Sequence, residues 1–131
     1  KFPVEGPVIV AINHVNSLTD AAIILSSCPR DVRLTCKDTL LHDGSLMSFF
    51  IRNIESIPFQ RRMDYAQTEQ HRVDNTQSMS VLSRELGAGC CVGLFPEGLC
   101  RYKPQLSQFR TGVARTAIDY VCNALQANRS G

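Results

Sequence analysis

Two apolar stretches that each run into polar residues indicate the fold of this chain: GPVIVAINH at residues 6–14 and CCVGLFPEG at residues 90–98. The first has four β-branched residues among the five from Val8 to Ile12, which is typical of a strand buried on both faces. The second is a continuous apolar run that Pro96 ends. Both stretches therefore predict strands inside a sheet.

Outside these stretches, strand and helix periodicities alternate along the chain. Two further strands are expected at 32–36 and 54–59, the second at an edge or a bend because it contains Pro58. Helices are expected at 19–27, at 40–52, and from an N-cap at Asn75 to a stop at residues 87–89. The last helix carries the apolar stripe Val113, Ala114, Ala117, Ile118, Val121 and Leu125. The β-α-β-α-β-α-β-α order predicts an α/β fold, a mostly parallel sheet flanked by helices.

Length and composition limit what the chain can be. Its 131 residues predict a single domain, 1–131, and the 44% hydrophobic content allows a packed core. A net charge of +2 and the absence of tryptophan argue against nucleic acid as a partner. The apolar runs fall far short of the roughly 20 residues that span a bilayer. Because the chain opens with Lys1, we expect it to be an excerpt of a longer protein.

The six cysteines contain no C-x-x-C pair and no repeated spacing. A zinc site is therefore not expected, and no metal ligands are assigned. Several of the cysteines lie inside apolar runs, where a free thiol behaves as a small core residue. We expect them to be reduced.

A candidate general base lies at the end of the first strand, where His14 is followed by Asp20 six positions later. A carboxylate that accepts a hydrogen bond from one ring nitrogen leaves the other nitrogen able to take a proton from a hydroxyl. On a continuous helix, six steps would turn about 240° round the axis and place the two side chains on different faces. The segment between them must therefore be a turn, for which Asn16 and Ser17 are suitable residues.

Candidate anion-binding residues lie near the same edge of the predicted sheet. Glu97 and Gly98 follow a buried strand, Arg101 comes three residues later, and Arg61 follows the short strand that contains Pro58. Arginine suits planar anions such as phosphate. The stretch 101–115 has no acidic residue and contains Arg101, Lys103, Arg110 and Arg115. The alternative for this basic stretch is a solvated surface.

Taken together, these motifs resemble the glycerolipid acyltransferases, the phospholipid/glycerol or lysophospholipid acyltransferase domain. Three of the family's four blocks occur in order: Asn13-His14 with Asp20, Ile57-Pro58-Phe59-Gln60-Arg61, and Phe95-Pro96-Glu97-Gly98. The segment Phe109-Arg110-Thr111-Gly112 is similar to a pattern in the glycerol-3-phosphate and dihydroxyacetone-phosphate acyltransferase branch. The resemblance covers nearly the whole chain.

The chain departs from the family pattern in three places. Five residues rather than the usual four separate His14 from Asp20. Leu99 and Cys100 stand where a serine or threonine often follows the third block. The fourth block is absent, so the sheet is expected to be truncated on its C-terminal side.

The resemblance implies a role for each matching residue. His14 would be the general base and Asp20 would orient it, while Arg61 and Arg101 would hold the phosphate of the acceptor. Glu97 and Gly98 would shape the pocket around that phosphate. The reaction would move an acyl group from a CoA or carrier-protein thioester to a phosphorylated glycerol or a lysophospholipid, in phospholipid biosynthesis. The thioester is a co-substrate, and no other cofactor is expected.

The resemblance also implies a location and leaves alternatives open. It places the domain on a membrane surface with the active site facing the cytosol, at the endoplasmic reticulum in a eukaryote. One alternative makes Cys100 the nucleophile of a thioester hydrolase. Another is a catalytically silent domain that binds membrane lipid. An apolar cluster could face such a membrane, although its periodicity favours a place mostly in the core: Leu46, Met47, Phe49, Phe50 and Ile51.

Overall fold

The structure is a computed structural model that describes residues 1–65 and 72–129. Its strands are β1 (Val8–Ala11), β2 (Val32–Lys37), β3 (Ile57–Phe59) and β4 (Cys91–Leu94). Its α-helices are α1 (Ser17–Ser27), α2 (Leu46–Asn53), α3 (Thr76–Gly87) and α4 (Gly112–Arg129). Two short 3-10 helices, η1 (Asp38–Leu41) and η2 (Arg62–Tyr65), follow β2 and β3.

The strands form one parallel sheet in the order β1-β4-β2-β3. Ala11 of β1 is opposite Leu94 of β4, so the two strands end at the same level. This arrangement confirms the α/β prediction, the alternation of strands and helices, and the edge position of the strand that contains Pro58.

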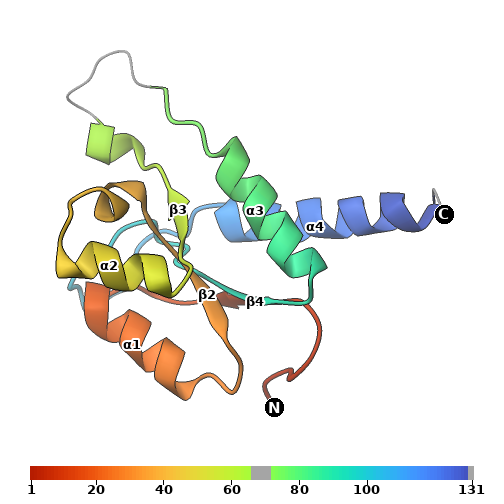
Figure 1. Ribbon diagram of the computed structural model, residues 1–131, viewed down its shortest axis with the longest axis horizontal. Coiled ribbons are helices and arrows are strands. Elements are labelled where there is room, and N and C mark those ends of the chain that lie inside the picture. The colour runs from red at the N-terminus through yellow and green to blue at the C-terminus, as the bar shows by residue number, and fades with distance from the viewer. Residues whose placement is uncertain (66–71, 130–131) are drawn as a thin grey trace.

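Helices cover the two faces of the sheet, as Figure 1 shows. On one face, Leu82 and Leu86 of α3 pack against Val92 and Leu94 of β4, with α4 beside them. On the other face, α1 packs against Val32 and Leu34 of β2 and Cys91 of β4. The sheet therefore divides the core into two layers, and β4 contributes residues to both.

The first strand is more exposed than its sequence predicts. Continuous apolar character suggested burial on both faces, but Val8, Ile9 and Val10 are half-buried and Ala11 is exposed. The reason is position: within the described residues β1 pairs with β4 alone and forms an edge of the sheet. The prediction of a fully buried strand is therefore wrong for β1, whereas all four residues of β4 are buried.

Local turn chemistry shortens two of the expected elements. The helix expected at 40–52 is divided, because Asp43 accepts hydrogen bonds from Ser45 N and Oγ, and Ser45 Oγ then caps α2 by accepting from Ser48 N. The strand expected at 54–59 begins only at Ile57, because Glu55 has a positive φ of 51° in the preceding turn.

The start of α3 is close to the predicted one, although Asn75 acts differently from a simple cap. Its side chain makes no capping hydrogen bond to the helix. Instead, Asn75 Oδ1 accepts from Gln60 N at 2.8 Å and Nδ2 donates to Gln60 O at 3.0 Å. Asn75 therefore ties the start of α3 to the residue that follows β3.

The apolar cluster on α2 is largely outside the core, contrary to the prediction from periodicity. Ser48 and Ile51 are the buried residues of this helix, whereas Leu46, Phe49 and Phe50 are each more than 60% exposed. The helix has eight residues and packs chiefly on η1, so it covers too little surface to bury both sides. The exposed side chains lie at positions i, i+3 and i+4 and form one apolar face.

A similar correction applies to the stripe expected on α4. Val113 and Tyr120 pack on the core and Thr116 is buried, while Ile118, Val121 and Leu125 are exposed. Within the part of the chain that the structure describes, no helix has the length and apolar character needed to cross a membrane.

A pair of leucine variants tests this core. Leu82 is fully buried, so Leu82→Ala should lower the free energy of unfolding by about 2–5 kcal/mol through lost burial and a residual cavity. Leu125 is 55% exposed, and Leu125→Ala should change it by less than about 0.5 kcal/mol. Urea denaturation followed by circular dichroism measures both. Equal losses in the two variants would contradict the packing described for α3.

Candidate active site

His14 and Asp20 are in direct contact beyond the end of β1. The distance from His14 Nδ1 to Asp20 Oδ2 is 3.0 Å, and both side chains are largely buried. Residues 14–16 are not helical and α1 begins at Ser17, so a turn brings the two groups together as the spacing predicted. Asp20 lies in the first turn of α1, where the helix dipole favours an anion.

Asp20 is organised to remain ionised. Besides the imidazole, its Oδ2 accepts hydrogen bonds from the backbone N–H groups of Val15 and Asn16, both at 2.8 Å. Burial opposes the charged form, but the hydrogen bonds from Asn16, His14 and Val15 outweigh it and lower the pKa of Asp20 from its ordinary value. An ionised carboxylate only accepts, so Nδ1 of His14 must carry the proton. In a neutral imidazole Nε2 then has the free lone pair.

An aromatic ring holds the imidazole from one side. The rings of His14 and Phe95 are stacked with their centroids 4.1 Å apart and an angle of 27° between their planes. Phe95 directly follows β4, the neighbour of β1. Stacking and the bond to Asp20 together restrict the orientation of the ring, which a general base requires.

Glu97 joins the two strand ends through backbone contacts. Because Ala11 is opposite Leu94, His14 and Glu97 each lie three residues beyond a paired position. Glu97 Oε1 accepts from His14 N at 3.2 Å and Oε2 accepts from Ser107 N at 3.1 Å. The residue is only 5% exposed, and these hydrogen bonds, first that from His14 and then those from Ser107, lower the pKa of Glu97. Both oxygens of the carboxylate therefore accept hydrogen bonds from backbone N–H groups.

Further backbone bonds attach the loop after β4 to the same place. Arg101 N donates to His14 O at 3.1 Å, and Arg110 N donates to Pro96 O at 2.8 Å. Gly98 N donates to Phe95 O at 3.0 Å in a turn where Gly98 has a φ of +65°. Gly98 is therefore in the left-handed region that favours glycine. The sequence predicted Gly98 and Arg101 near His14, and the structure places them there.

Arg61 lies apart from the other predicted site residues. It follows β3, and the strand order puts β3 three inter-strand spacings from β1, roughly 14 Å. Its Nε and Nη2 both bind the carboxylate of Asp64, at 2.7 and 2.9 Å. One edge of the guanidinium is therefore occupied by Asp64 in this structure. A role for Arg61 in binding phosphate stays a prediction.

Cys100 lies beside the site without the surroundings of a nucleophile. Its Sγ is 3.4 Å from Val15 O, a contact in which the protonated thiol donates. A backbone carbonyl cannot act as the general base that activates a cysteine nucleophile. The geometry therefore argues against the hydrolase alternative.

Three residues of the site were missed by the sequence reasoning. Phe95 was named in a buried strand and in the third block but was given no role, Ser107 was not singled out, and Arg110 was noted as a basic residue and as part of the Phe109-Arg110-Thr111-Gly112 segment. The stacking of Phe95 and the bond from Ser107 arise from tertiary contact and leave no local signal. For Arg110, the preceding Phe109 and following Gly112 formed the available signal.

The site lies beyond the carboxyl ends of β1 and β4. Two hollows of about 490 and 570 Å³ lie elsewhere, the first between α3 and α4 and the second near Arg30 and Cys90 at the other end of the strands. Neither is lined by His14 or Asp20. Among the described residues, no group of three or more His, Cys, Asp or Glu side chains is placed to hold a metal ion.

A comparison with known proteins identifies the family. The sequence model of the Acyltransferase family matches residues 1–125, nearly the entire chain. This chain therefore belongs to the Acyltransferase family, and its general activity is acyl transfer. No curated protein and no solved structure matches it.

Glu97→Gln tests the role of the buried carboxylate in stability. We expect a melting temperature lower by a few degrees at pH 7, because the amide group cannot accept from both backbone N–H groups. The pKa of Glu97 is lowered in the folded protein, so its contribution is present above the ordinary glutamate pKa of about 4.3. The difference in melting temperature between wild type and Glu97→Gln should therefore shrink as the pH falls from the ordinary glutamate pKa through the lowered pKa of Glu97 in the folded protein.

Differential scanning calorimetry between pH 3 and pH 7 measures this difference. Glu5→Gln is the matched control, because Glu5 is exposed. A gap between wild type and Glu97→Gln that stays constant with pH would show that the charge of Glu97 does not contribute.

Proposed function

We propose that this domain transfers an acyl group from an acyl thioester, such as acyl-CoA, to a hydroxyl of glycerol 3-phosphate or a related phosphorylated glycerolipid. The observation that carries the proposal is the His14–Asp20 pair, with Nδ1 bound at 3.0 Å and Nε2 free to accept a proton. Family membership supports acyl transfer in general. Our proposal adds the identity of the acceptor and the use of the His14–Asp20 pair as the general base.

The reaction follows from the chemistry of the two substrates. Nε2 of His14 takes the proton of the acceptor hydroxyl as its oxygen attacks the thioester carbonyl carbon. A carbon–oxygen bond forms, the carbon–sulfur bond breaks, and the leaving thiolate takes the proton back from the imidazolium. A thioester is already activated, so a base and a positioned hydroxyl suffice without an acyl-enzyme. Asp20 keeps the imidazole in the required tautomer and stabilises its charged form.

Substitution of the pair tests the mechanism. His14→Ala and Asp20→Asn should each reduce kcat for acyl transfer by about 10²–10⁴-fold, because the proton acceptor is removed or wrongly oriented. The assay uses the protein in membranes, with acyl-CoA as donor and glycerol 3-phosphate or lysophosphatidate as acceptor in parallel.

The matched control is His42→Ala, because His42 is an exposed histidine between η1 and α2 and should be dispensable. Unchanged turnover in both pair variants would end this proposal. A folded wild type that transfers to neither acceptor would favour another acceptor first, and then the catalytically silent lipid-binding alternative.

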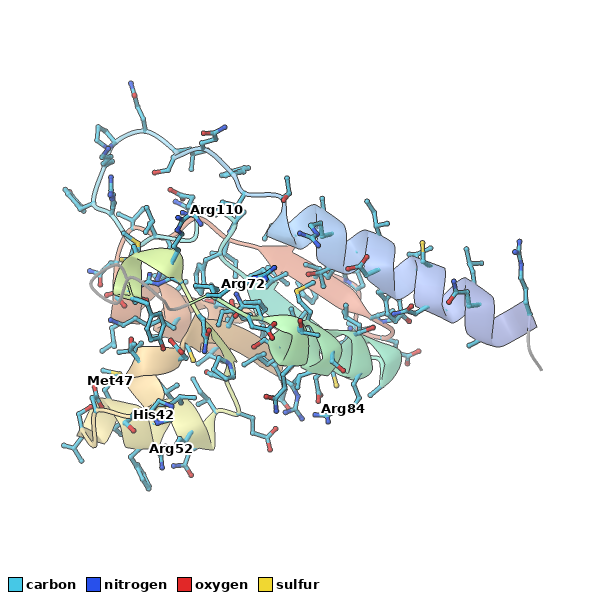
Figure 2. The ribbon with its side chains drawn as sticks, turned by 90° about the horizontal axis from the view of Figure 1, so that it is seen from above. His42, Met47, Arg52, Arg72, Arg84 and Arg110 are labelled. Carbon is cyan, nitrogen blue, oxygen red and sulfur yellow. The ribbon has the colours of Figure 1, made fainter. Side chains whose placement is uncertain are left out.

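We further propose that α2 brings the domain to a membrane surface, where a glycerolipid acceptor would be found. The support is its apolar face, where Leu46, Phe49 and Phe50 are exposed on a helix whose opposite side is buried. Figure 2 shows the side chain of Arg52 at this same corner, apart from Arg110. Apolar side chains beside an arginine suit an anionic lipid surface.

Paired aromatic variants test this surface. Phe49→Ser with Phe50→Ser should reduce binding to vesicles of phosphatidylcholine and phosphatidylserine by at least about tenfold, since each buried phenylalanine contributes roughly 1.5–3 kcal/mol. Vesicle co-sedimentation measures the partition coefficient. Ile118→Ser with Val121→Ser on α4 is the control, because these residues are similarly exposed. Equal losses in the two double variants, or none, would refute a specific role for α2.

A further inference from the structure

The aromatic ring of Phe95 lies against the face of the imidazole that we propose as the general base. The centroids of the Phe95 and His14 rings are 4.1 Å apart, and the angle between the two planes is 27°. Among the described residues, the other close pair of rings is Phe49 with Phe50, which contains no histidine. The face of a phenyl ring carries negative electrostatic potential. A positive charge that forms on the imidazole would therefore lie where the Phe95 ring attracts it.

The backbone on both sides of the stack fixes the two rings relative to each other. Phe95 directly follows the buried Leu94 at the end of β4, and its carbonyl oxygen accepts from Gly98 N at 3.0 Å. Leu94 O accepts from Ile12 N at 3.0 Å, and His14 is two residues further along the chain. The stack therefore follows from the pairing of β1 with β4 and from the turn after β4.

Charged and titratable groups surround His14 on the elements packed against it. Asp20, in the first turn of α1, binds Nδ1, and Glu97, beyond β4, accepts from the backbone N–H of His14. Arg101 N donates to His14 O at 3.1 Å. The other groups of this kind in the surrounding turns are the thiol of Cys100 and the guanidinium of Arg110. A substitution of Phe95 removes none of these groups, so its effect on the charge of the imidazole can be assigned to the ring.

We infer that Phe95 is a positioning residue whose ring favours the charged imidazolium that forms when His14 takes the proton of the acceptor hydroxyl. The inference rests on the acyl transfer proposed above. Asp20 acts in the plane of the imidazole, through Nδ1, whereas Phe95 acts on its face. Neither contact occupies Nε2, so both stabilise the charge while the reactive nitrogen stays open to the hydroxyl.

Steady-state kinetics of Phe95→Leu in the full-length, membrane-bound protein tests this role. The leucine keeps an apolar side chain against the imidazole but has no π face. With acyl-CoA and glycerol 3-phosphate or lysophosphatidate, we expect kcat to fall roughly 3–30-fold, because the imidazolium loses the attraction of the ring. KM for both substrates should change by less than about twofold, since the ring acts on the base and not on the substrate. Phe95→Tyr retains the ring face and should retain most of the rate.

The pH dependence of kcat/KM separates this role from a purely structural one. A general base acts when it is neutral, so the rate falls on the acid side as the imidazole is protonated. Without the ring face the imidazolium is less stable, and in Phe95→Leu the acid limb should move to lower pH by about half a unit. Pentafluorophenylalanine at position 95 keeps the shape but reverses the potential of the ring face, and should move the limb in the same direction. Phe2→Leu is the control, because Phe2 packs on the other face of the sheet.

Three kinetic results would overturn the inference. The first is a Phe95→Leu protein with the wild-type kcat and an unmoved acid limb. The second is a raised KM with an unmoved acid limb, which would place Phe95 against the substrate instead of the base. The third is a fluorinated protein that behaves as wild type, which would show that the ring supplies shape and no charge stabilisation. If Phe95→Leu does not fold by circular dichroism, the fluorinated protein, which has nearly the same shape, provides the same comparison.

A measurement without turnover distinguishes this inference from the proposed function. In the purified full-length protein with isotope-labelled histidine, NMR titration follows the charge of the imidazole directly, and His14→Ala identifies the signal of His14. A titration midpoint that is lower by about half a pH unit in Phe95→Leu would support the inference even in a wild type that transfers no acyl group. Absence of transfer would then reject the proposed function only. Equal midpoints in wild type and Phe95→Leu would overturn the inference whatever the activity.

Discussion

The buried carboxylate of Glu97 is the interaction on which the candidate site depends. It accepts from His14 N, beyond β1, and from Ser107 N, in the loop between β4 and α4. These segments are separated by more than 80 residues in the chain and meet because β1 pairs with β4 in parallel register. A charged acceptor holds a backbone N–H more strongly than a neutral one. The position of the proposed base is thus maintained by a residue that need not touch substrate.

Several arginines bind other groups of the fold, whereas others have no carboxylate partner among the described residues. Arg33 with Glu85, Arg61 with Asp64, and Arg30 with the carbonyl oxygens of Gly6 and Gly89 use their donors inside the fold. Arg110, in the basic loop after β4, rests on a glycine, and like Arg101 and Arg115 it is paired with no acid among the described residues. Satisfied guanidinium groups stabilise the fold, whereas an unpaired one remains available to an anionic ligand.

Sequence reasoning predicted the sheet well and the exposed surfaces poorly. The order of strands and helices followed from periodicity, and the turn between His14 and Asp20 followed from the geometry of a helix. The burial of the apolar residues on α2 and α4 was predicted wrongly, since Phe49 and Ile118 are exposed. An apolar stripe shows that a helix has a face suited to burial. It does not show whether another element lies against that face, because burial depends on segments far away in the chain.

The sequence by itself determined the parallel α/β alternation and the presence of a histidine, a carboxylate and a Pro-Glu-Gly turn at strand ends. These features are local, since each depends on residues within one or two turns of chain. Only the tertiary structure decided that β1 is an edge strand, that Glu97 holds backbone on both sides, and that Arg110 rather than Arg61 lies next to the turn bonded to His14. These arrangements depend on strand order and on contacts between distant segments, which no local pattern encodes.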